Sequence, residues 1–390
     1  MKKTISILGS TGSIGLSTLK IIDKKKNLFS INLLSAHKNY VSIVSQIRKY
    51  KPKVFVISNN RIFEKIKKKF KNKKKIIILN NFNQIKLKRK TDITVSAIPG
   101  LVGLQPTIKM LRISKKILIA NKESIICGWS IIKKIALKNK TKIIPVDSEH
   151  FSILKLLENN NLNEIKKIYI TASGGPFLEY KSHQFKKITP SQAIKHPKWK
   201  MGKKISVDSS TLMNKILEII EAQKLFNIPS NKLDILIHPN SLVHAIVELK
   251  NGLSKFIFHE TTMIIPLANA IFDNRLDIEE FIKLKKNRIS AENKNLIFQK
   301  VDEKIFPVIR LKNRANEHTS TSIILNAANE ILVDHFLGKK LPFLSISKII
   351  LGILNDRNYL KYAIKIPKNI DQIIEIDKWA RNLTLSKIRL

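Results

Sequence analysis

Seven short apolar runs fill the first 146 residues, and they restrict the possible folds more than any other feature of the chain. Most of the runs are continuous rather than alternating, and segments with a helical pattern separate the runs. Continuous apolar strands are typical of parallel sheets, because helices cover both faces of such a sheet. The sequence therefore predicts a doubly wound, Rossmann-like α/β domain over residues 1–146. The runs are TISIL, INLLS, VFVIS, IIIL, ITVSA, ILIA and KIIPV.

The pattern changes after Phe151, and a chain of 390 residues is longer than one core usually covers. Residues 165–177 read as a strand that enters a glycine-rich turn, and residues 209–226 read as one amphipathic helix. Asn251 and Gly252 separate two strands in a hairpin pattern. We predict a central α+β domain with an antiparallel sheet at 147–272, a linker at 273–300 and a helical domain at 301–390.

The formal net charge of +43 on its own suggests an anionic partner such as nucleic acid. Only 11 of the 72 basic residues are arginine, whereas proteins that read nucleic acid rely on arginine forks. Lys, Ile and Asn share A/T-rich codons, so a bias of the source genome explains the charge about as well. We expect no nucleic-acid partner, although a basic surface can help to attract an anionic substrate.

Cysteine usage and hydropathy bear on the compartment. The single cysteine, Cys127, excludes an internal disulfide framework and fits a reducing compartment. The N-terminal apolar stretch is too short for a signal peptide, and glycines interrupt it. The chain has no run of about 18 uncharged apolar residues, which a membrane-spanning helix would need. We expect a soluble, cytoplasmic protein with no membrane partner.

The first strand runs into GSTGSIG, Gly9 to Gly15, which resembles a dinucleotide-binding turn. Glycines let the backbone approach a pyrophosphate, and the following helix directs its free N–H groups at that anion. Thr11 stands where the usual fingerprint has its second glycine, so a purely structural turn is the alternative. After the second strand, NAD-binding proteins usually have an acid. This chain has His37 and Lys38 there, which favours the 2′-phosphate of NADPH unless Lys38 is an ordinary surface lysine.

The stretch PVDSEH places Asp147 and Glu149 two residues apart after the last apolar run. In an extended segment these side chains would point to the same side, and paired carboxylates need a proton or a cation between them. Mg²⁺ and Mn²⁺ prefer such oxygen ligands. The alternative is a helix N-terminus, with Asp147 or Ser148 as the cap.

The helix that follows Ser206 supports the metal hypothesis. Asn214, Lys215 and Glu218 fall on one helical face, where they could bind a phosphate and complete the metal site. An ordinary exposed polar face is the alternative, and Glu221, one turn further on, is a rival metal ligand. Two loops also suit a ligand: TASGGPF contains Ser173, and HPKWKMG contains a tryptophan that fits a mobile lid.

These segments occur in one order along the chain, and together they resemble the 1-deoxy-D-xylulose 5-phosphate reductoisomerase family of the non-mevalonate isoprenoid pathway. The resemblance covers essentially the whole chain, and PVDSEH with HPKWKMGKKISVDS is its most specific part. It implies a homodimer that uses NADPH and a divalent cation, Mg²⁺ or Mn²⁺, to rearrange and reduce a sugar phosphate. The other motifs are GSTGSIG, ANKES, SGGPF, MNK…LE…IEA, IHPNS and LNAANE.

The resemblance also implies roles for individual residues. The metal ligands correspond to Asp147, Glu149 and Glu218, which with Lys122 form the catalytic set. The substrate site corresponds to Lys122, Ser148, Glu149, Ser173, His196, Trp199, Ser209, Asn214, Lys215 and Glu218, and Met201 belongs to the lid with Trp199. The cofactor contacts correspond to Thr11, Gly12, Ser13, Ile14, His37, Lys38, Asn39, Asn121, Lys122, Glu123 and Gly202.

The chain departs from the family pattern at three places. Ile216 and His37 stand where the family usually has glycine, and ETTMIIPL lacks the acid and the arginine that many relatives have before Pro266. These changes concern efficiency more than reaction class. Two alternatives remain: another NADP- and metal-dependent oxidoreductase, which substrate tests would separate, and a nucleic-acid-binding protein on an old enzyme fold, which would bind DNA at physiological salt.

We predict that the protein binds NADPH more tightly than NADH. The second strand is followed by Lys38 and not by an acidic residue. A contact with the 2′-phosphate should contribute about 1.4 kcal/mol or more, which corresponds to about tenfold in affinity. Titration of both cofactors measures the ratio, and equal affinities would contradict the assignment of Lys38.

Overall fold

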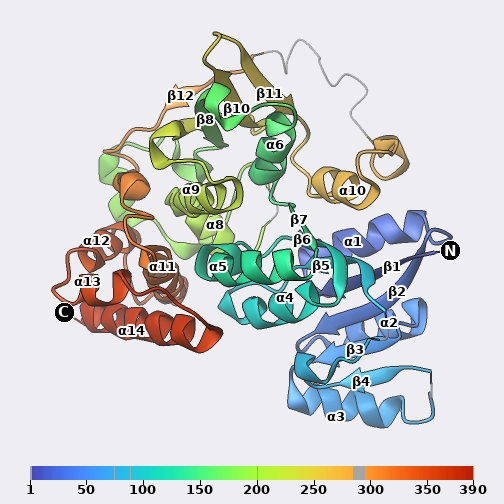
Figure 1. Cartoon of the computed structure of the whole chain (residues 1–390). Helices are drawn as coiled ribbons and strands as arrows, with labels where there is room; N and C mark the ends of the chain where they lie inside the picture. The colour runs from blue at the N-terminus through green and yellow to red at the C-terminus, as the bar shows by residue number, and fades with distance from the viewer. Residues whose placement is uncertain (1, 74, 88, 200, 284–294, 390) are drawn as a thin grey trace. The chain divides into compact units, whose positions relative to one another are not determined.

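The computed structural model describes residues 2–73, 75–87, 89–199, 201–283 and 295–389. The chain forms two compact units (Figure 1). The first contains residues 1–124, 130–147 and 263–286, and the second contains residues 125–129, 148–262 and 287–390. The segment predicted as a linker begins in the first unit, and part of it lies outside the described residues. The division into three domains stays a prediction.

The first unit is built on a parallel sheet with the strand order β4-β3-β2-β1-β5-β6-β7. All seven apolar runs form its strands, so the doubly wound fold is confirmed. The strands are β1 (Lys3–Leu8), β2 (Phe29–Ala36), β3 (Val54–Ile57), β4 (Ile77–Leu79), β5 (Thr91–Ser96), β6 (Ser114–Ile119) and β7 (Lys142–Pro145). The helices are α1 (Ser13–Lys24), α2 (Tyr40–Tyr50), α3 (Asn60–Lys69), α4 (Leu104–Leu111), α5 (Lys122–Lys138, shared with the second unit) and α10 (Ile264–Phe272).

The strand order reverses between β1 and β5, and open sheets bind ligands at the carboxyl ends of such strands. Gly9 lies at this edge with φ +78°, and a Cβ there would be 2.7 Å from the carbonyl oxygen of Ala97. A Cβ on Gly15 would be 2.4 Å from the carbonyl oxygen of Gly9. Both positions therefore require glycine, while Gly12 is the exposed N-cap of α1.

The second unit contains a mixed sheet with the strand order β11-β10-β8-β9-β12. The predicted hairpin is present, but the prediction of an antiparallel sheet is only partly correct, because β8 and β9 are parallel. The helices between these two strands provide the long crossover that a parallel pair requires. The strands are β8 (Ile165–Ala172), β9 (Leu233–Ile237), β10 (Val243–Leu249), β11 (Ser254–Phe258) and β12 (Gln299–Lys300), and the helices before β9 are α6 (Ser148–Leu157), α7 (Pro190–Ala193), α8 (Lys203–Ser210) and α9 (Met213–Phe226).

The single helix predicted over 209–226 is in fact the end of α8 followed by α9. The break lies at Leu212, which is buried and left-handed, with φ 63° and ψ 7°. This conformation costs a non-glycine residue roughly 1–2 kcal/mol. The exposed polar face considered for this segment is also wrong, because Lys215, Glu218 and Glu221 are buried.

The C-terminal part of the second unit is helical, as predicted. Its central helix, α11, packs against both α12 and α14. Within the described residues, no helix is long and apolar enough to cross a membrane. The helices are α11 (Thr321–Leu337), α12 (Phe343–Ile353), α13 (Tyr359–Ala363) and α14 (Ile370–Arg389).

A half-buried lysine joins three helices of the second unit. Lys224 on α9 donates hydrogen bonds to the carbonyl oxygen of Ile126 at 2.6 Å and to the hydroxyl of Ser322 at 2.8 Å. The Ser322 hydroxyl donates to the same carbonyl at 2.9 Å. Non-helical dihedral angles at Gly128 interrupt α5 just after Ile126. Burial lowers the pKa of Lys224 from 10.5 to about 8.

We predict that Lys224→Met removes part of the pH dependence of stability. Between about pH 8 and pH 10.5 the unfolded chain carries the Lys224 proton and the folded chain does not, so wild-type stability rises relative to the variant across this window. The rise should be about 3 kcal/mol at most. Urea unfolding at several pH values measures it. Lys361→Met, at an exposed position, is the control, and equal slopes for wild type and Lys224→Met would contradict the assignment.

Candidate active site

Three carboxylates lie close together around the start of α6. Asp147, Glu149 and Glu218 each have an oxygen, and these oxygens lie within 4.8 Å of one another. Asp147 is bonded to Ser148, the first residue of α6, so Glu149 is helical and not extended. The expectation of an extended pair was therefore wrong in its geometry. The carboxylates meet because α9 packs against α6.

The Lys215 side chain provides the positive charge in this cluster. Its ammonium donates to Glu149 Oε1 and, at 2.7 Å, to Glu218 Oε2. Burial alone would lower the pKa of Lys215, but the two carboxylates outweigh burial and raise it. Glu218 also accepts a hydrogen bond from the Asn214 amide. Lys215 is thus a buried cation held between two of the three predicted metal ligands.

Asp147 lies at the N-terminus of α6 and also belongs to the carboxylate cluster. The two roles considered for it, helix cap and metal ligand, are therefore compatible. It directly precedes α6, and it lies 3.3 Å from the ammonium of Lys122. Both side chains are less than one-fifth exposed. The neighbouring Ser148 hydroxyl donates to Glu149 Oε2 at 2.5 Å, which fixes the orientation of that carboxylate.

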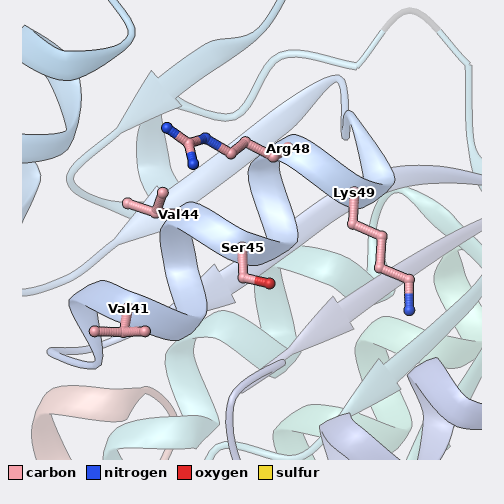
Figure 2. A pocket seen from close by; sticks show the side chains of 5 residues that line it. All are labelled: Val41, Val44, Ser45, Arg48 and Lys49. Atoms are coloured by element: carbon pink, nitrogen blue, oxygen red, sulfur yellow. The ribbon is translucent and has the colours of Figure 1, made fainter.

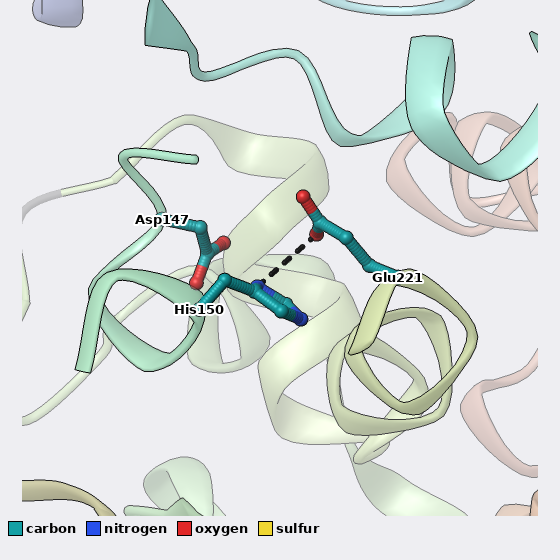
Figure 3. A group of neighbouring side chains, drawn as sticks. All are labelled: Asp147, His150 and Glu221. Atoms are coloured by element: carbon teal, nitrogen blue, oxygen red, sulfur yellow. Dashed lines mark ion pairs between the residues drawn. The ribbon is translucent and has the colours of Figure 1, made fainter. Parts of the chain in front are cut away.

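A second group beside the first contains a histidine (Figure 3). It joins Asp147 to His150 and to Glu221, the rival ligand considered from the sequence. His150 Nδ1 lies 3.4 Å from Glu221 Oε2, and both side chains are almost completely buried. His150 Nε2 lies 2.9 Å from the carbonyl oxygen of Glu218. Three carboxylates suit Mg²⁺ better than a set that includes imidazole, so the donor chemistry favours Glu218 over Glu221.

Ser173 and His196, both expected near a substrate phosphate, lie in contact. His196 Nδ1 accepts the backbone N–H groups of Lys198 and Trp199 at 3.1 and 2.9 Å. The neutral imidazole therefore carries its proton on Nε2, which donates to Ser173 Oγ at 2.9 Å. Ser173 Oγ also accepts the N–H of Gly175 at 3.1 Å. With two bonds accepted, the Ser173 hydroxyl can donate its own proton to an anion.

Burial, together with the nearby charge of Lys215, lowers the pKa of His196 to about 4. The geometry and the electrostatics therefore agree that this imidazole is neutral near pH 7. A neutral imidazole whose tautomer is fixed on both sides positions the Ser173 hydroxyl rather than contributing a charge.

The turn after β8 packs directly against the end of α8. Gly175 has φ +65°, and a Cβ there would lie 3.0 Å from Ser210 Cα and 3.1 Å from the carbonyl oxygen of Ser209. Only a glycine fits this close approach. It brings the Ser173 turn beside Ser209, another residue expected near the phosphate.

The predicted lid residues lie in the coil before α8. The Trp199 ring meets His244, on β10, edge to face with a centroid separation of 6.0 Å. Met201 and Gly202 directly precede α8. Closure of this segment over a substrate stays a prediction.

The predicted cofactor residues of the first unit lie along the carboxyl edge of its sheet. Thr11 and Gly12 lie in the turn before α1, and Ser13 and Ile14 are the first two residues of that helix. His37 and Lys38 are exposed after β2, and His37 bonds with Ser58 at 3.0 Å. Two asparagines of this set cap helices with their side-chain oxygens. Asn39 caps α2 and accepts a hydrogen bond from the backbone N–H of Ser42 at 3.1 Å, and Asn121 caps α5 and accepts from the backbone N–H of Ser124 at 2.5 Å. Glu123 is buried in the first turn of α5.

The surface of the first unit has a shallow hollow on α2 (Figure 2). Its lining contains none of the residues predicted from the sequence for a site. The lining residues are Val41, Val44, Ser45, Arg48 and Lys49.

Family profiles match three parts of the chain. Residues 5–128 match 1-deoxy-D-xylulose 5-phosphate reductoisomerase, residues 143–226 match the C-terminal domain of that enzyme, and residues 259–383 match a DXP reductoisomerase C-terminal domain. A curated 1-deoxy-D-xylulose 5-phosphate reductoisomerase from Pelagibacter ubique is 44% identical over 97% of both chains. This chain belongs to the 1-deoxy-D-xylulose 5-phosphate reductoisomerase family.

Solved structures of the reductoisomerase family have the same fold. A DOX-P reductoisomerase in complex with NADPH, fosmidomycin and magnesium is 31% identical, with a TM-score of 0.91 over 100% of this chain and 98% of its own. The Zymomonas mobilis enzyme in complex with NADPH is 29% identical, with a TM-score of 0.88 over 100% of this chain and 99% of its own.

Sequence reasoning assigned no role to two titratable residues of the reductoisomerase motifs. His150 lies inside PVDSEH and Asp208 lies inside KISVDS, and both are almost completely buried. The available signal was a titratable residue beside an apolar one, because Phe151 follows His150 and Val207 precedes Asp208.

We predict that His196 titrates far below an ordinary histidine. Its burial and the charge of Lys215 should keep the imidazole neutral, with the proton on Nε2, at every pH above about 5. Two-dimensional ¹H–¹⁵N NMR of the histidine rings, with the spectrum of His196→Gln for assignment, reports both properties. A pKa near 6.5, or a proton on Nδ1, would show the assignment to be wrong.

Proposed function

We infer that the chain converts 1-deoxy-D-xylulose 5-phosphate into 2-C-methyl-D-erythritol 4-phosphate, with NADPH as reductant and a divalent cation as cofactor. The observation that carries this inference is the cluster of Asp147, Glu149 and Glu218 in a member of this family. The reaction rearranges the carbon skeleton of the substrate and reduces the resulting aldehyde.

The residues fit a divalent cation. The cluster already attracts a positive charge, since the Lys215 ammonium bonds to Glu149 and Glu218. A hard cation would meet three carboxylates, as Mg²⁺ and Mn²⁺ prefer. When bound, the cation supplies Lewis-acid polarisation of the substrate carbonyl, and NADPH supplies a hydride.

Lys215 connects the metal and phosphate functions. Its ammonium and a divalent cation compete for the same carboxylate oxygens. A divalent cation held by Glu149 and Glu218 would balance their charge, and the Lys215 ammonium would then be available for the substrate phosphate. We propose Lys215, Ser173, Ser209 and Asn214 as the residues of the phosphate site.

We propose Lys122 for proton transfer or oxyanion stabilisation at the reacting end of the substrate. Its ammonium is 3.3 Å from Asp147, and its side chain is only 11% exposed. A buried ammonium beside a metal ligand can stabilise negative charge that develops on a substrate oxygen. The Ser148 hydroxyl holds the Glu149 carboxylate in place.

The NADPH site is proposed for the turn between β1 and α1. This turn requires glycine at Gly9 and Gly15, so the backbone can approach a pyrophosphate at the start of a 12-residue helix. The exposed His37 and Lys38 are proposed to meet the 2′-phosphate.

The direct test is NADPH oxidation, followed by absorbance, with and without 1-deoxy-D-xylulose 5-phosphate and Mg²⁺. We expect turnover only when both are present. A protein that binds NADPH but leaves this substrate unchanged at any Mg²⁺ or Mn²⁺ concentration would contradict the proposed function.

We also propose a homodimer, as the family resemblance implies, and a cytoplasmic location, which the single buried cysteine suits. Light scattering coupled to size-exclusion chromatography tests the first proposal, and a monomer at micromolar concentration would contradict it. Fractionation of the source cells tests the second, and recovery outside the cytoplasmic fraction would contradict it.

We predict that Glu218→Gln lowers turnover by orders of magnitude and weakens Mg²⁺ binding. The substitution keeps the size of the side chain but removes one negative charge, and one well-placed charge interaction is worth roughly 3–4 kcal/mol in a transition state. NADPH affinity should not change, because its proposed site lies mainly in the first unit. The kinetic constants and calorimetric titrations with Mg²⁺ and NADPH measure these effects.

Glu221→Gln is the control on the same helix. It should weaken Mg²⁺ binding less than Glu218→Gln, because Glu221 pairs with His150. If Glu218→Gln kept near-normal Mg²⁺-dependent activity while Glu221→Gln lost it, the third ligand would be Glu221.

A further inference from the structure

The motif LNAANE on α11 has no role in the site described above, although one of its residues reaches a site-forming helix. Asn329 is fully buried, and its amide donates to Asp208 Oδ1 at 2.7 Å. Asp208 lies on α8 and is 1% exposed. Its other oxygen accepts from Lys204 Nζ at 3.0 Å. A buried carboxylate depends on such donors, because losing one leaves its charge poorly solvated.

The residue after Asp208 belongs to the proposed phosphate site. Ser209 follows it directly, and the backbone of Ser209 and Ser210 packs against Gly175. Gly175 in turn donates its N–H to Ser173 Oγ. The backbones are in close contact at Gly175, so a shift of α8 would move the Ser173 turn as well.

We propose that Asp208 and Asn329 are positioning residues through which the C-terminal helix α11 holds α8, Ser209 and the Ser173 turn in the geometry that binds the phosphate of the substrate. This inference rests on the proposed function. Neither residue touches the phosphate itself, and both act through the backbone of α8.

Reciprocal substitution in the full-length protein tests the proposal. Asn329→Asp brings two buried carboxylates together, and Asp208→Asn removes the charge that Asn329 and Lys204 contact. Each should raise the KM for the substrate and the inhibition constant of inorganic phosphate about tenfold or more. The kcat at saturating substrate should stay within about threefold, because the carboxylate cluster is untouched. The double variant again pairs one carboxylate with one amide, and it should recover most of the phosphate affinity.

Asn326→Ala is the matched control. Asn326 is fully buried on the same helix, and its amide contacts Glu330 of its own helix at 3.3 Å rather than α8. It should leave the inhibition constant of phosphate unchanged even if it lowers the melting temperature. NADPH affinity, measured by fluorescence, should be the same in all variants.

Three results would overturn the proposal. The single variants could lower the melting temperature without changing the phosphate affinity, or Asn326→Ala could lower the phosphate affinity as much as they do. The third result is a double variant that folds but recovers none of the phosphate affinity. If either single variant fails to fold, the phosphate affinity of Asn329→Ser is measured instead. This substitution replaces the amide donor to Asp208 with a shorter side chain and adds no charge. Failure of the proposed function is a separate result, in which the wild type does not turn over the substrate at all.

Discussion

The ammonium of Lys215 lies between the carboxylates of Glu149 and Glu218, and the arrangement of the candidate site depends on this contact. Without it, the two carboxylates would bring like charges together where little water reaches them. With it, α6 and α9 can pack closely enough for the three proposed metal ligands to meet. The same charge lowers the pKa of His196, which fixes that imidazole as a neutral donor to Ser173. The proposed metal ligands and the proposed phosphate-binding residues thus depend electrostatically on one lysine.

The sheet of the first unit could be predicted from the sequence because burial on both faces produces continuous apolar runs. The glycine-rich turn was equally visible, since the close approaches at Gly9 and Gly15 admit no other residue. The second sheet was harder to predict, because the sequence does not reveal which strand pairs in parallel across a crossover. The hairpin at Asn251 and Gly252 was the exception, because its signal is local.

Most residues of the candidate site were predicted from family motifs. Physical reasoning alone left more than one role open for several of them. It could not tell whether the polar face of α9 is buried or exposed, because a buried charge network and a solvated face have the same helical spacing. It also gave no role to Asp208 or His150, whose partners are far away in the sequence. Contacts of this kind depend on packing between helices, which a local pattern does not encode.

The left-handed residue between α8 and α9 limits how this region can vary in evolution. Glycine would suit the backbone at Leu212 but would leave a hole where a large side chain is buried. Every other residue keeps the backbone strain, and β-branched residues would increase it. Leucine fills the buried space and tolerates the left-handed backbone conformation, so few other residues can replace it at this position. The redirection of the chain that aims Asn214 and Lys215 at the carboxylates therefore depends on the fit of one apolar side chain, and sequence drift that spares every polar residue of the site could still disable it.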